Sequence, residues 1–63
     1  MIYVLIERKK ENLFEVSLLD SETGFVSDLV RRTTFSRAQN TAQLWIEEGQ
    51  DAGLDISKHI KYR

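Results

Sequence analysis

The sequence predicts a small two-layer α+β domain, in which a three-stranded antiparallel meander has one face covered by a single helix. Two segments near the N-terminus alternate apolar and polar residues with a period of two, and a third such segment follows a turn that ends in glycine. One amphipathic stretch with helical periodicity, from about Phe35 to Gly53, comes after them. We therefore expect residues 1–63 to form one domain.

The first two strands are predicted from their alternation. Ile2, Val4 and Ile6 alternate with their neighbours, and the β-branched residues among them favour a strand. A second alternating segment runs from about Leu13 to Leu19. Only the polar break from Lys9 to Asn12 separates the two, so we expect an antiparallel hairpin.

The segment from Phe25 to Thr34 follows the turn Asp20-Ser21-Glu22-Thr23-Gly24 and has two interpretations. A helix could begin at Ser27. The strand is preferred, because Thr33 and Thr34 are poor residues for a helix interior.

As a strand, this segment is expected to place Val26 and Val30 on one face of the sheet and Phe25 and Leu29 on the other.

The predicted helix begins with Ser36 as N-cap and Gln39 completing a capping box. Gly53 suits the C′ position, because glycine readily adopts the left-handed conformation that closes a helix. One stripe should face the sheet, and Trp45 should supply most of its contact area. The stripe consists of Ala38, Ala42, Trp45, Gly49 and Ala52, with Ile46 widening it.

After the helix, Leu54 and Ile56 are expected to pack back onto the core. His59 to Arg63 again alternates, which predicts either a short edge strand or a fraying tail.

The composition indicates a soluble cytoplasmic protein. The chain has no cysteine, and its nine basic and ten acidic residues give a formal net charge of −1. The apolar start MIYVLI is six residues long and is followed by charged residues, so it is too short for a membrane span. We expect no membrane association.

No arrangement of residues suited to catalysis or metal binding is found, so we predict a protein that is not an enzyme and needs no cofactor or metal. His59 is the single histidine, and nothing near Ser57 and His59 in the sequence would orient the ring. Glu47 and Glu48 are adjacent on a helix, so their side chains diverge by about 100°.

The sheet face away from the helix is expected to be partly apolar, which favours contact with a protein partner or with a second copy in a homodimer. The candidate contact residues are Tyr3, Leu5 and Leu19 on that face and Leu44 on the helix.

The alternative function is nucleic-acid binding through a basic sheet edge formed by Lys10, Arg31, Arg32 and Arg37. The nearly balanced net charge argues against it.

The run TFSRAQNTAQLWIEEG after a three-strand meander resembles the N-terminal domain of HicB-type antitoxins over roughly Met1 to Gly49. The Asp-x-Pro-Gly turn usual in that family is absent, and Leu19 to Gly24 occupies its place. The resemblance implies a non-catalytic protein that acts by covering a partner, and it transfers no functional residue. The same pattern is similar to the arm-type DNA-binding domains of phage integrases.

These observations favour a small regulatory protein that works through protein–protein contact, either antitoxin-like or an inhibitor from a phage or mobile element.

Overall fold

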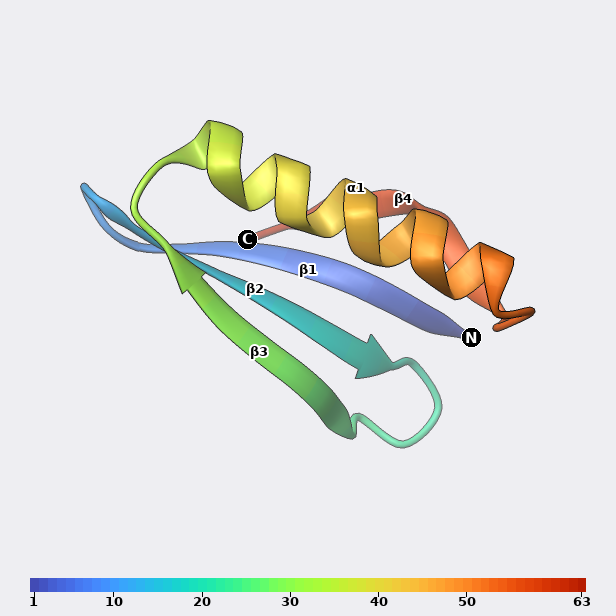
Figure 1. Cartoon of the computed structure of the whole chain (residues 1–63). Coiled ribbons are helices and arrows are strands. Elements are labelled where there is room, and N and C mark those ends of the chain that lie inside the picture. Colours follow the sequence, from blue (N-terminus) through green and yellow to red (C-terminus); the bar gives the residue numbers. More distant parts are fainter.

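The computed structural model describes all residues from Met1 to Arg63. It contains four strands and one helix, in the order β1 (Ile2–Lys10), β2 (Leu13–Asp20), β3 (Val26–Arg32), α1 (Phe35–Asp51) and β4 (Ile56–Tyr62). The strands form a single sheet in the order β3-β2-β1-β4, and α1 lies across one side of it (Figure 1). The predicted α+β meander with one covering helix is confirmed, and the segment after Gly24 is a strand as preferred.

The position of β4 completes the sheet. β2 pairs antiparallel with both β1 and β3, whereas β4 pairs parallel with β1. A parallel neighbour requires a crossover connection, which α1 provides as the chain passes from β3 at one edge to β4 at the other. The alternating C-terminal residues are therefore an edge strand and not a fraying tail.

The core lies between α1 and the even-numbered residues of β1 and β2. Ala38 and Ala42 are fully buried, so the helix lies close to the sheet. Gly49 continues this close approach, because a Cβ there would lie 3.2 Å from two side-chain atoms of Ile56. The core residues are Val4, Ile6, Phe14, Val16, Ala38, Ala42, Ile46 and Ile56.

Three expectations about the helix stripe and the residues after it need correction. Trp45 is only partly buried and packs at the margin of the core, while Ile46 takes the central position. Ala52 is exposed, because the helix ends at that point. Leu54 is also exposed, whereas Ile56 is buried as expected.

The helix begins two residues earlier than predicted. Thr34, not Ser36, is the N-cap, and its hydroxyl accepts a hydrogen bond from the Arg37 N–H at 3.2 Å. The extended backbone of Thr34 allows this geometry. Gln39 does not close a capping box; its amide donates to the Tyr62 hydroxyl at 3.3 Å.

The C-terminal end of the helix agrees with the prediction. Gly53 has a φ of 78°, and its N–H donates to the carbonyl of Gln50. The Leu54 N–H donates to the carbonyl of Gly49, which completes a Schellman motif.

A register shift in β3 changes one predicted face. Leu18 pairs with Asp28, but Leu19 pairs with Val26, so one residue of β3 is inserted between the two pairs. The insertion places Val26 opposite Leu19, on the face away from the helix, and not beside Val30.

Candidate functional site

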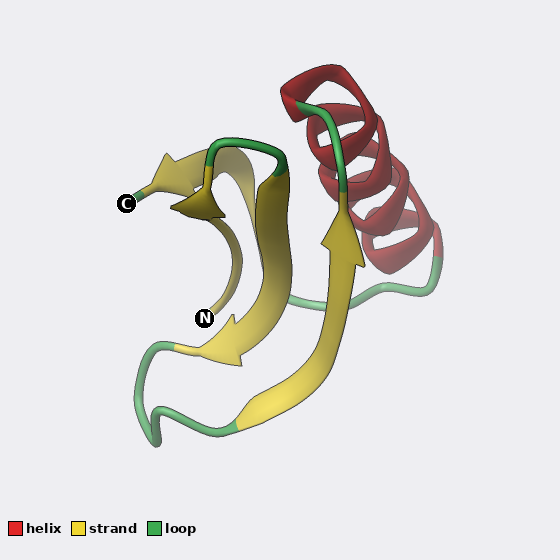
Figure 2. Ribbon diagram, turned by 90° about the vertical axis from the view of Figure 1, so that its left-hand side faces the viewer, coloured by secondary structure: helices red, strands yellow, loops and turns green.

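The face of the sheet away from α1 has no covering element. In Figure 2 the helix lies on one side of the bent strands, and the other side is open. Leu5 and Ser17, paired across β1 and β2, are nevertheless only 5% and 4% exposed. Because no helix covers them, their own neighbours on this face must shield them from water.

The neighbours are largely apolar. Tyr3 and Leu19 form one cross-strand pair and are partly buried. Val26 and Leu29 on β3 are 44% and 43% exposed. These four residues together with Leu5 are called the open-face patch. An exposed apolar area of this kind indicates a contact surface in a small protein.

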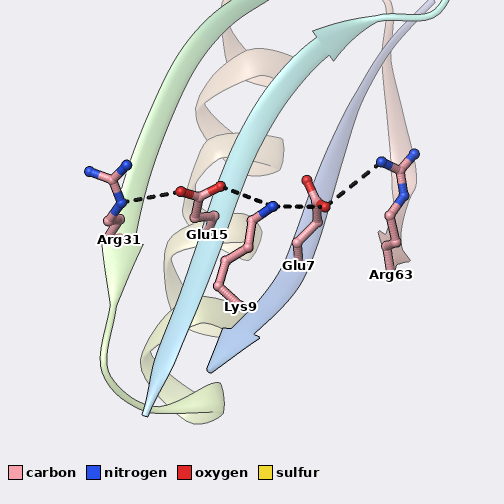
Figure 3. Close-up of polar contacts among 5 residues, drawn as sticks. All are labelled: Glu7, Lys9, Glu15, Arg31 and Arg63. Carbon is pink, nitrogen blue, oxygen red and sulfur yellow. Dashed lines mark hydrogen bonds and ion pairs between the residues drawn. The ribbon is translucent and has the colours of Figure 1, made fainter. Parts of the chain in front are cut away.

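A row of alternating charges borders the patch and crosses the whole sheet (Figure 3). Glu15 of β2 accepts from Arg31 Nε at 3.1 Å and lies 3.7 Å from Lys9 Nζ. Lys9 Nζ lies 3.3 Å from Glu7, which also pairs with Arg63 at 3.7 Å. We call Arg31, Glu15, Lys9, Glu7 and Arg63 the charge row.

The two carboxylates of the charge row are its covered members. The side chains of Glu15 and Glu7 are 14% and 19% exposed, whereas those of Arg31 and Arg63 are 64% and 73% exposed. Each carboxylate contacts two cations, so the row orders long side chains at the border of the patch. Lys61 adds a further cation 4.3 Å from the centre of the Tyr3 ring.

A second feature is a shallow aromatic hollow of about 430 Å³ near the beginning of the helix. The Phe35 ring lies 5.7 Å from Phe14 and 5.9 Å from Tyr62, between centroids. Arg8 and Arg63 also line it. Its residues come from β1, β2, α1, β4 and the C-terminal residue Arg63, and no local pattern in the sequence predicts that they meet.

The predicted contact residues divide between two surfaces. Tyr3, Leu5 and Leu19 share the open face, as expected from alternation, but Leu5 is buried beneath the surface of the patch. Leu44 is 52% exposed and lies on the helix, on the other layer.

The predicted basic residues are not brought together on one face. Arg31 is opposite Glu15 on the open face, whereas Arg32 is opposite Phe14 and donates to Thr41 of the helix. Lys10 lies at the end of β1 and Arg37 in the first turn of α1.

The structure contains no group of three or more histidine, cysteine or carboxylate residues that could hold a metal. The contacts between Ser57 and His59 involve the serine hydroxyl and backbone atoms of His59, not its ring. The single helix, α1, lacks the length and apolar character needed to cross a membrane.

Comparison with family models, with curated proteins and with solved structures finds no match for this chain.

Proposed function

We propose that this chain is a small non-catalytic regulatory protein that acts through protein–protein contact and forms a homodimer. The observation that supports this function best is the open-face patch, an apolar surface on a sheet face that α1 does not cover. The charge row at its border suits a partner surface with an apolar centre and a charged rim, the usual anatomy of protein interfaces.

The resemblance to HicB-type antitoxins supports the same class. The segment order on which it rests, three strands followed by a helix, is the order in the structure. Within this class, an antitoxin-like protein and an inhibitor from a phage or mobile element use the same mode of action, which is to cover a partner.

Nucleic-acid binding is not favoured by the arrangement of cations. Arg31 is neutralised by Glu15, and Arg32 faces the opposite side of the sheet. A groove-binding sheet needs its cations on one surface.

Photo-crosslinking tests the open face as the contact surface. A benzophenone amino acid replaces Tyr3 in the chain expressed in its own host, and the same group replaces Gln43, an exposed helix residue, as the control. We expect a defined protein adduct from position 3 and none from position 43.

A pair of matched variants makes the test specific. Val26→Lys places a charge on the patch, and Leu54→Lys places one at a site of similar exposure elsewhere, 44% against 48%. The first should abolish the adduct and the second should leave it. Identical adducts from positions 3 and 43, or an adduct that survives Val26→Lys, would contradict the proposal.

A further inference from the structure

β3 is an edge strand whose only neighbour is β2. Residues 26–29 are all exposed. The backbone groups on the outer side of such a strand are open to pairing with another chain.

The hydrogen bonds of the sheet identify which groups of β3 face outward. The N–H groups of Ile2 and Arg8 donate to the carbonyls of Asp55 and Arg63, which flank β4. The N–H and C=O groups of the even-numbered residues of β1 therefore point toward β4. The N–H and C=O groups of the odd-numbered residues of β1 point toward β2, where their partners are also odd-numbered.

The same alternation continues into β3. The N–H and C=O groups of the even-numbered residues of β2 point toward β3, where these residues pair with Asp28, Val30 and Arg32. Leu29 and Arg31 are thus the residues whose N–H and C=O groups face away from the sheet.

Two of these outward groups are held by side chains of β3 itself. The Leu29 N–H donates to Asp28 Oδ1 at 3.0 Å. The Arg31 carbonyl accepts from Arg32 Nη1 at 2.9 Å. The donor and the acceptor that a second strand would use are therefore occupied by one anion and one cation.

We propose that β3 pairs antiparallel with β3 of a second copy, with Val30 opposite Val30. This inference rests on the proposed function, because it assigns the interface of the homodimer. In this register the Leu29 N–H of one copy faces the Arg31 carbonyl of the other, and the reverse pair forms by symmetry.

The register also matches the charges. It places Asp28 directly opposite Arg32 of the second copy, on the helix side of the sheet, and it does so twice. On pairing, Asp28 releases the Leu29 N–H and Arg32 releases the Arg31 carbonyl. The two side chains then pair with each other across the interface. Opposite charges facing across a strand pair stabilise it, and like charges destabilise it.

The gain on pairing comes mainly from the apolar residues of the edge. Val30 is partly buried and Leu29 is 43% exposed in the single chain, so both lose solvent contact when a second strand is added. The pairing spans residues 28–32 and is short. We expect an interface below the ~1,200 Å² of stable complexes, and hence a weak dimer that dissociates on dilution.

A two-fold pairing of β3 with itself closes the assembly. Pairing of β3 with β4 of another copy would leave one edge of each kind free and would build open chains. The self-complementary charges of β3 favour the closed arrangement.

Cysteine crosslinking tests the register directly, because the chain has no cysteine of its own. Val30→Cys would place two Cα atoms about 4.5 Å apart in a pair without backbone hydrogen bonds, within the disulfide range of roughly 4.4–6.8 Å. Ser27→Cys is the control, since Ser27 is exposed and lies outside the pairing of residues 28–32, and residue 27 and its own copy would be offset by six residues, about 20 Å.

We expect mild oxidation to convert Val30→Cys to a disulfide dimer and to leave Ser27→Cys without a disulfide. Equal crosslinking of the two variants, or none for a folded Val30→Cys, would overturn the register.

A charge exchange supplies a second test that does not depend on Val30. Asp28→Arg and Arg32→Asp, each alone, should raise the dimer dissociation constant roughly tenfold by placing like charges opposite. The double variant should return it to within about threefold of the original. Failure of the double variant to restore dimerisation contradicts the inference.

The tests of the β3 interface and the crosslinking test of the open face can fail separately. If the charge variants do not affect dimerisation while the Tyr3 crosslink persists, the β3 interface is wrong and the open-face contact stands. If the β3 dimer forms but position 3 yields no specific adduct, the β3 interface stands and the open-face contact is wrong.

Discussion

At the scale of single residues, the ends of α1 are fixed by short-range hydrogen bonds. Thr34 caps the N-terminus, and Gly53 closes the C-terminus with a positive φ. The sequence identified the glycine correctly, since few other residues adopt that conformation easily. It did not identify the cap, because TFS offers two hydroxyl residues two positions apart, and both suit an N-cap equally by type.

The two candidate caps can be separated by mutation. Thr34→Ala should destabilise the fold by about 1 kcal/mol, because the Arg37 N–H loses its acceptor. Ser36→Ala, inside the helix, should have little effect or stabilise slightly, since alanine has the higher helix propensity. Urea unfolding of both variants measures the difference, and an equal loss for the two would contradict the assigned cap.

At the scale of elements, the strands that are neighbours in sequence were predictable and the long-range pairing was not. Period-two alternation and the turn at Gly24 specify β1, β2 and β3 as a meander. No local pattern shows that β4 lies beside β1, because that pairing depends on the crossover of α1. The inserted residue near Val26 was also invisible, since it depends on the partner strand.

The candidate site was predictable to the same extent. Alternation placed Tyr3, Leu5 and Leu19 on one face, but it could not show that Leu5 is shielded there. The charge row joins residues of β1, β2, β3 and the end of the chain, so it required the assembled sheet. Arg31 was expected at a basic edge, because no local pattern shows that it pairs with Glu15, which is sixteen residues away.

The charge row is expected to stabilise the sheet through Glu15, which contacts two cations. Glu15→Gln should reduce the free energy of unfolding, because it removes the carboxylate that pairs with Lys9 and Arg31. The loss should be only about 1 kcal/mol, because the pairs are partly exposed and screened by solvent. The loss should shrink at high salt. Thermal or urea unfolding at low and high ionic strength measures both effects.

Glu47→Gln provides the control, since Glu47 is exposed on α1 and forms no ion pair. A loss equal to that of Glu15→Gln would show that general charge, and not the row, causes the effect.

At the scale of the whole molecule, one helix covers one side of a four-stranded sheet and leaves the other side and the β3 edge free. A chain of 63 residues buries only about 60% of its unfolded surface. Association therefore offers such a domain both stability and function. The open-face patch and the edge of β3 occupy different parts of the surface, so a homodimer could present two patches to a partner.

Sedimentation velocity across a dilution series, from millimolar to nanomolar chain, measures whether the chain associates with itself. We expect a concentration-dependent equilibrium, with a mass that rises from 7.4 kDa toward twice that value as the concentration increases. A single species of 7.4 kDa at every concentration would contradict it.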